Sequence, residues 1–266
     1  MILAIDIWKQ WVFSLGELPI YLVLLVALFI MIKRGGASLK NYILWIIALI
    51  VVIVALSSPL AYLAHGYLFY AHMLQHVAIL MLLPALLFLS LDGTGEKWQG
   101  RKVKLRPVLS WVVFVLFMWL IHAPGFVNES MPLFRICPTP EQWSNIQPLV
   151  YLLSLLIGLW FYYPVLNPDY SNRLAPMKGI SYLVTACIAC SLLGIAIAFS
   201  PKILYPKFSE NVMSGNLQSL VVNDWKVSPR SDQQVAGLIM WVPGCLIYLS
   251  ISMVIFFKWM SNEKVS

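Results

Sequence analysis

Two histidines spaced four residues apart stand at the start of a long apolar stretch of the chain. They are His72 and His76, and the residues that follow are almost all hydrophobic as far as Leu89. On an α-helix, side chains at this spacing share one face with their Cβ atoms about 6 Å apart, so both rings can reach one ion. Polar side chains at membrane depth are costly and usually mark a functional site. We therefore expect the pair to bind a metal; the alternative is interfacial histidines that only hydrogen-bond to loops.

Three further side chains are candidate ligands of the same metal. His122 follows a second apolar run, Met118 lies one turn earlier on the same face, and Met73 is the neighbour of His72. Thioethers suit Cu(I), and imidazole suits copper, zinc, iron and nickel, so this set favours copper in the Cu(I) state. A zinc protease would need Glu directly after the first histidine, where this chain has Met73. The structural alternatives are a helix-end cap for His122 and core filling for the methionines.

Asp232 comes directly before the last apolar run of the chain. Asp at this position is an ordinary helix cap. A carboxylate that receives the ring N–H of a ligand histidine, and so orients it, is an equally good interpretation. Both remain open at this point.

Cys187 and Cys190 form a CxxC pair, but they lie inside an apolar run among Ile, Ala and Leu. Small residues at spacings of three or four usually serve helix packing in membranes. We expect packing to be the role of this pair and of Cys245 as well.

The composition of the 266 residues identifies a membrane protein, because 61% are hydrophobic and only 11% are charged. Apolar runs long enough to cross a bilayer recur, and they are continuous rather than alternating, which favours helices over a barrel. We predict an all-α, integral membrane bundle that forms a single transmembrane domain over residues 1–266, with a kink at Pro84. The predicted seven spans cover about 19–32, 42–56, 71–89, 107–122, 148–166, 179–199 and 233–259.

The basic residues predict the orientation of this bundle. Most of the 18 Lys and Arg residues fall after the first, third and fifth predicted spans and at the C-terminus. The positive-inside rule makes that face cytoplasmic, with the N-terminus outside and the C-terminus cytoplasmic. The net charge of +7 is thereby explained by topology, with membrane lipids and no nucleic acid as partners. His72, His76, His122 and Asp232 then share the outer level of the membrane.

With these residues in view, the chain resembles the CtaG family of bacterial cytochrome c oxidase assembly factors, which are seven-span membrane proteins. Three stretches carry the resemblance: residues 72–76 with Pro84, residues 122–124 (His-Ala-Pro), and residues 232–244 (Asp-Gln-Gln-Val-Ala-Gly-Leu-Ile-Met-Trp-Val-Pro-Gly). Supporting matches are Gly158, Trp160, Pro164, Leu193, Gly194, Leu204 and Tyr205. Family members commonly have further histidines just before the fifth span, whereas residues 141–147 of this chain contain none. The resemblance therefore implies a smaller or altered site here.

The resemblance implies a role in building a haem-copper oxidase in the bacterial inner membrane, at the copper-insertion step. Together with the histidines, it predicts a copper-binding chaperone rather than an enzyme, whose partners are oxidase subunits and another copper carrier. One alternative is a haem-binding membrane electron carrier. His72 and His76 share one face and would not both bind one iron, so His122 would supply the second axial ligand. A metal-free assembly scaffold is the other alternative; a copper importer would need more polar groups across the membrane depth.

Overall fold

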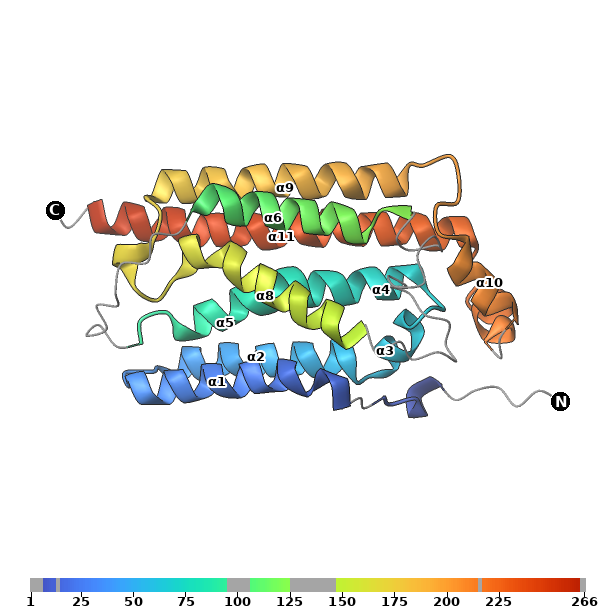
Figure 1. Cartoon of the computed structure of the whole chain (residues 1–266), viewed down its shortest axis with the longest axis horizontal. Coiled ribbons are helices and arrows are strands. Elements are labelled where there is room, and N and C mark those ends of the chain that lie inside the picture. Colours follow the sequence, from blue (N-terminus) through green and yellow to red (C-terminus); the bar gives the residue numbers. More distant parts are fainter. Residues whose placement is uncertain (1–6, 13–14, 95–105, 125–146, 215–216, 264–266) are drawn as a thin grey trace.

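The computed structural model describes residues 7–12, 15–94, 106–124, 147–214 and 217–263. Within these ranges all regular secondary structure is helical, and the long helices lie side by side along the longest axis of the molecule (Figure 1). The helical elements are η1 (Ile7–Lys9), η2 (Leu15–Glu17), α1 (Leu18–Arg34), α2 (Leu39–Leu56), α3 (Pro59–Ala64), α4 (Phe69–His76), η3 (Val77–Leu82), α5 (Leu83–Leu91), α6 (Pro107–Ile121), α8 (Gln147–Leu166), η5 (Tyr170–Asn172), α9 (Pro176–Ala198), α10 (Pro206–Ser214), η6 (Ser219–Asp224) and α11 (Pro229–Glu263).

The all-α architecture is confirmed for the described residues. Six helical stretches are long and apolar enough to cross a membrane: Leu15–Arg34, Leu39–Leu56, Phe69–Leu91, Gln147–Leu166, Pro176–Ala198 and Pro229–Ser261. They coincide within a few residues with six of the seven predicted spans. The stretch predicted as the fourth span, 107–122, forms the shorter apolar helix α6 of 15 residues.

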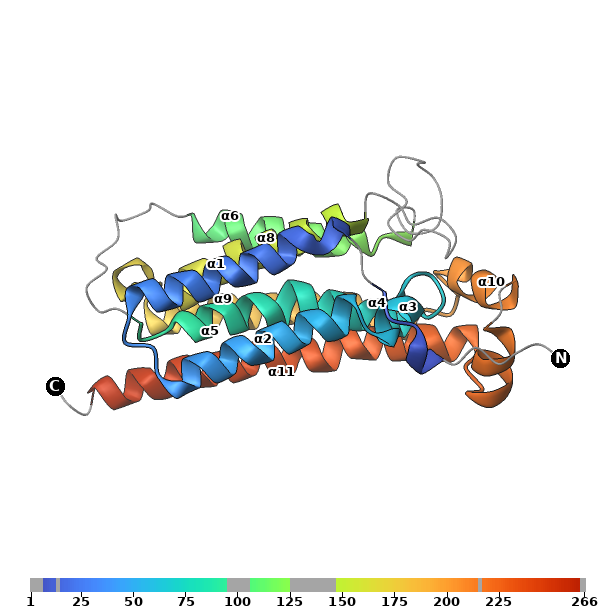
Figure 2. The same cartoon turned by 90° about the horizontal axis from the view of Figure 1, so that it is seen from below.

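The span that carries the histidine pair is the most enclosed of the six. In its most apolar window 72% of the residues are buried, against 28% to 56% in the other five. Figures 1 and 2 place α4 and α5 in the middle of the bundle in both views. One core cluster joins this span to α6, α8, α9 and α11, and a second joins it to α1, α2 and α8. His72 and His76 therefore lie on the central element of the fold.

The central span is not a uniform α-helix, and Pro84 lies where it changes. Between α4 and α5 the chain forms a π-helix, η3, directly before the turn that contains Pro84. Proline has no amide hydrogen, and its ring clashes with the carbonyl four residues earlier, here that of Leu80. The span therefore departs from regular α-helical geometry directly before Pro84, where the sequence predicts a kink. Gly158 of α8 fits against it, because a Cβ there would meet the Leu80 carbonyl and lie 2.6 Å from Pro84 Cγ.

The two ends of the bundle differ in chemistry. At one end, Asp92 follows α5 and its carboxylate pairs with Lys258 and, at 2.7 Å, with Arg173. Burial raises the pKa of Asp92, but hydrogen bonds and charge from Lys258 and Arg173 outweigh it and hold the pKa below its usual value. At the other end lie α3, the start of α4, and α10 (Figure 1). The candidate ligands gather toward this second end.

Candidate metal centre

A small internal cavity lies between α4, η3, α6 and α11. Its volume is about 10 Å³, close to the minimum of roughly 10–15 Å³ that one water-sized particle needs. It is lined by two imidazoles, four thioethers and two aliphatic side chains, from Met73, His76, Val77, Leu80, Met81, Met118, His122 and Met240. The lining therefore combines nitrogen and soft sulfur donors with no charged side chain.

The three candidate histidines come together from two elements, and two of them line the cavity. The Nε2 atoms of His72 and His76 lie 2.9 Å apart, within hydrogen-bond distance. The ring centroids of His76 and His122 lie 5.2 Å apart, and each of the three histidines is at most 3% exposed. The structure thus brings together side chains 46 and 50 positions apart in sequence. His76 and His122 line the cavity, whereas His72 does not line it and contacts the ring of His76.

The hydrogen bonds of His122 leave one ring nitrogen facing the interior without a partner. Its Nδ1 lies 2.6 Å from the carbonyl oxygen of Met118, an arrangement in which Nδ1–H donates and Nε2 keeps its lone pair. Among the described residues, His122 Nε2 and His76 Nδ1 have no hydrogen-bond partner. Leaving a buried polar atom unpaired costs about 1–3 kcal/mol, so two such atoms beside one cavity point to a ligand.

Asp232 fixes the start of α4, the helix that carries His72 and His76. Its Oδ2 and Oδ1 accept the amide hydrogens of Phe69 and Tyr70, each at 2.9 Å. The first amides of a helix have no intrahelical acceptor, and a carboxylate there also favours the helix dipole. Asp232 is therefore a cap of α4 rather than of its own helix α11. The hydrogen bonds described for its carboxylate go to these backbone amides and reach no histidine ring.

Gln75 secures the other face of α4, and the sequence analysis did not identify it. The side chain is fully buried, its Nε2 donates to the Ala55 carbonyl at 2.6 Å, and its Oε1 accepts from the Tyr151 hydroxyl at 2.9 Å. These bonds attach α4 to α2 and α8. Its position between the two histidines was the available signal, because a fully buried amide must find partners.

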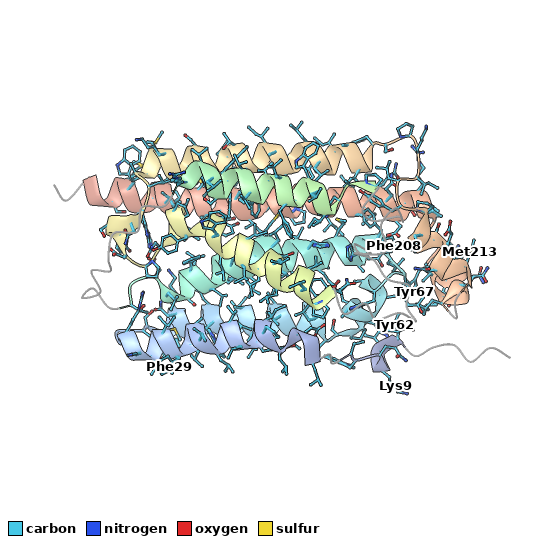
Figure 3. All side chains as sticks on the ribbon, viewed as in Figure 1. Lys9, Phe29, Tyr62, Tyr67, Phe208 and Met213 are labelled. Carbon is cyan, nitrogen blue, oxygen red and sulfur yellow. The ribbon has the colours of Figure 1, made fainter. Side chains whose placement is uncertain are left out.

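Two aromatic residues between α9 and α11 contact the histidines. The Tyr205 hydroxyl donates to the carbonyl of His122 at 2.6 Å, and the Phe208 ring centroid lies 5.8 Å from that of His72. Phe208 lies at the end of the bundle beside the start of α4 (Figure 3). Gln233 anchors the segment that carries them by accepting the amide hydrogen of Leu204 at 2.6 Å. Both aromatic residues thus pack against the histidines from this end of the bundle.

The methionines distinguish this site from a conventional histidine and carboxylate centre. Met73 and Met118 line the cavity, and so do Met81 and Met240, which the sequence analysis did not single out. Within the described ranges, no group of three or more His, Cys, Asp or Glu side chains is placed to hold a metal. An ion in this cavity would therefore depend on thioether sulfur in addition to imidazole.

The comparisons with known proteins give a single family. The sequence profile described as cytochrome c oxidase caa3 assembly factor (Caa3_CtaG) matches residues 19–262. No curated protein and no solved structure shows significant similarity to the chain. Because the profile covers nearly the whole chain, including all the residues that line the cavity, the chain belongs to the family of cytochrome c oxidase caa3 assembly factors.

Proposed function

We propose that the protein binds Cu(I) in the His/Met cavity and passes it to a cytochrome c oxidase during assembly. The observation that carries the proposal is the cavity lining, in which four thioethers surround the same space as two buried imidazoles, each with an unpartnered nitrogen. Thioether and imidazole together favour copper over the other common metals, and thioether favours the Cu(I) state. A monovalent ion in a neutral lining also carries a lower desolvation cost than a divalent one.

The residues divide into direct ligands and positioning groups. His76 and His122 are the imidazole ligands, and Met73 and Met118 are the soft ligands, joined by the two methionines that complete the lining. His72 holds the His76 ring through their Nε2 contact and becomes a ligand itself if that contact opens. Asp232 positions the helix that carries both histidines. Copper is the cargo in this account, so the protein acts as a chaperone and not as an enzyme.

The family and the basic residues support a location. We place the protein in a bacterial inner membrane with several spans, with its N-terminus outside and its C-terminus cytoplasmic, because the basic loops mark the cytoplasmic face. The cavity then lies toward the outer side, at the end of the bundle where Tyr205 and Phe208 contact the histidines. The partners in this proposal are haem-copper oxidase subunits as acceptors and another copper carrier as the donor.

The geometry disfavours the haem-binding alternative. A haem held by His76 and His122 would need the whole macrocycle between two rings whose centroids lie 5.2 Å apart, beside a cavity of about 10 Å³. A single metal ion needs no such opening. A metal-free assembly scaffold is consistent with the family alone, and the experiment below separates it from copper delivery.

The test is complementation of a strain that lacks the gene. We expect the wild-type chain and a His65→Gln control, which alters a histidine that neither lines the cavity nor belongs to the His72/His76 pair, to restore copper-loaded oxidase. The His76→Ala/His122→Ala double variant should give oxidase with depleted copper at equal membrane abundance of the assembly factor. The measurement is copper per purified oxidase, together with oxidase activity. Fully copper-loaded oxidase from the double variant would contradict copper delivery, and loss of oxidase protein without copper depletion would indicate a scaffold.

A further inference from the structure

A second group of sulfur atoms adjoins the His/Met cavity on the side of α9. The thiol of Cys190 lies 3.3 Å from the thioether sulfur of Met118, which lines the cavity. One turn earlier on α9, the Sγ of Cys187 lies 2.9 Å from the Sγ of Cys245 on α11. The Ser191 hydroxyl lies 3.1 Å from the same Cys245 sulfur. Three thiols and a thioether from α6, α9 and α11 therefore form two sulfur pairs, one helical turn apart along α9, which together make a sulfur-rich seam.

The close approach of α9 and α11 explains how the two facing thiols meet. A Cβ on Gly194 would lie 2.8 Å from the Gly237 carbonyl oxygen, and a Cβ on Gly237 would lie 2.6 Å from the Ala198 amide nitrogen. Small residues allow this kind of backbone contact between membrane helices. Cys187 precedes Gly194, and Cys245 follows Gly237, by about two helical turns each. The glycine contact thus sets the register that places both thiols on one seam.

We propose that Cys187 and Cys245 form a second, deeper binding site for Cu(I), linked to the His/Met cavity by Cys190 and Met118. Thiolate is a preferred ligand of Cu(I), and two sulfurs from facing helices supply a two-coordinate site. The inference rests on the proposed function for the choice of metal. It assigns to these cysteines a role beyond the helix packing that the sequence alone favours.

Charge balance makes such a site compatible with hydrocarbon surroundings. When Cu⁺ binds the pair, one thiol loses its proton to solvent and the other stays protonated. The positive charge of Cu⁺ therefore replaces that of the released proton, and the complex remains neutral. A net charge at this depth would be costly. Metal–sulfur bonds of about 2.3 Å, as found for zinc, require the two sulfurs to move apart to either side of the ion. Cys245 is only partly buried, which leaves its side chain room for that rotation.

The first test counts Cu(I) per chain by anaerobic competition with a coloured Cu(I) chelator in the purified full-length protein. We expect about two ions in the wild type, and about one each in Cys187→Ser/Cys245→Ser and in His76→Ala/His122→Ala. The matched control is Cys137→Ser, which removes a thiol outside α9 and α11 and should leave the count unchanged. Equal counts in the wild type and the Cys187→Ser/Cys245→Ser variant would overturn the second site. If the Cys187→Ser/Cys245→Ser variant lost copper while His76→Ala/His122→Ala kept the wild-type count, the result would instead contradict the His/Met site of the proposed function.

The second test observes the thiols directly and does not depend on the copper count. After reduction, the protein is treated with N-ethylmaleimide with and without Cu(I), and alkylation of each cysteine is measured by mass spectrometry. We expect Cu(I) to slow alkylation of Cys187 and Cys245 at least tenfold while Cys137 is unaffected, because both sulfurs of the pair are bound to the ion and neither is available to react. Equal alkylation of Cys187 and Cys245 with and without Cu(I) would contradict the proposal.

Discussion

The Nε2 atoms of His72 and His76 lie 2.9 Å apart, so one ring supplies an N–H and the other a lone pair. This contact occupies Nε2 of His76 and leaves its Nδ1 as the nitrogen without a partner among the described residues. The first histidine of the pair therefore orients the second, which lines the cavity. The two rings have different roles although they share one helix face.

This difference predicts unequal effects of the two single substitutions. His76→Ala should abolish tight Cu(I) binding to the cavity, because it removes a direct ligand. His72→Ala should weaken binding about 10-fold to 100-fold, as is typical when a group that orients a ligand histidine is lost. Competition titrations at several chelator concentrations measure both affinities. Equal losses in the two variants would show that His72 is a direct ligand in the free protein.

The thioether of Met118 should contribute to affinity separately from packing. Met118→Leu keeps the volume of a fully buried side chain, and such exchanges usually cost less than 1.5 kcal/mol of stability. We expect Cu(I) affinity of the cavity to fall about tenfold, because a soft ligand is lost. Met31→Leu, at a fully buried methionine of α1, is the matched control. Unchanged affinity for Cu(I) in the Met118 variant would assign this methionine to the core alone.

Asp232 should stabilise the start of α4 through its two backbone bonds. Asp232→Ala leaves the amides of Phe69 and Tyr70 without their acceptor, which should lower the free energy of unfolding by about 1–3 kcal/mol. Asp232→Asn keeps one acceptor oxygen and should cost less. Thermal unfolding in detergent gives the order of stability as wild type, then Asn, then Ala. The capping role would be contradicted if Asp232→Ala were as stable as the wild type while Asp232→Asn was destabilised.

Asp92 should make stability depend on pH at the opposite end of the bundle. Lys258 and Arg173 hold the pKa of Asp92 below its usual value despite burial, so folding is stabilised while the carboxylate stays ionised. That contribution is present above the ordinary carboxyl pKa and is lost as pH falls through the lowered one. Because the Lys258 side chain is 41% exposed, we expect Asp92→Asn to cost only about 1–2 kcal/mol at neutral pH. Thermal unfolding at neutral and acidic pH should show this difference shrink with acidity; a constant difference would contradict the ion-pair explanation.

The sequence was sufficient to predict the helical bundle because the bilayer itself sets the length of apolar runs. Predicted and observed ends agree within a few residues where Pro or Gly marks the helix ends, as at Pro107 and Gly35. The contacts that Tyr205 and Phe208 make with the histidines were not predictable in the same way. The helix α10, which carries Phe208, is too short and too polar to be recognised as an apolar span. The position of this segment depends on individual hydrogen bonds, such as that from the Tyr205 hydroxyl to the His122 carbonyl.

Of the residues that line the cavity, the sequence singled out His76, His122, Met73 and Met118 but not Met81 and Met240. Regular α-helical geometry rotates a residue five positions after His76 by roughly 140° from its face, which would direct Met81 away. The π-helix η3 widens the turns after His76, and Met81 lines the cavity with it. Met240 comes from α11, and only the packing of α11 against α4 and η3 places it there. Met81 was missed because of local helix geometry, and Met240 was missed because of tertiary packing. The periodicity of the sequence encodes neither.

The measurement that tests the central claim most directly is anaerobic Cu(I) binding to the purified protein, compared with the His76→Ala/His122→Ala variant. Cys187→Ser/Cys245→Ser serves as the common background, so that only the His/Met cavity is counted, and His65→Gln in that background is the control. The account predicts about one tightly bound Cu(I) per chain in the background and in the control, and none in the variant without the two cavity imidazoles. Undiminished binding without His76 and His122, or no binding in the background, would contradict it.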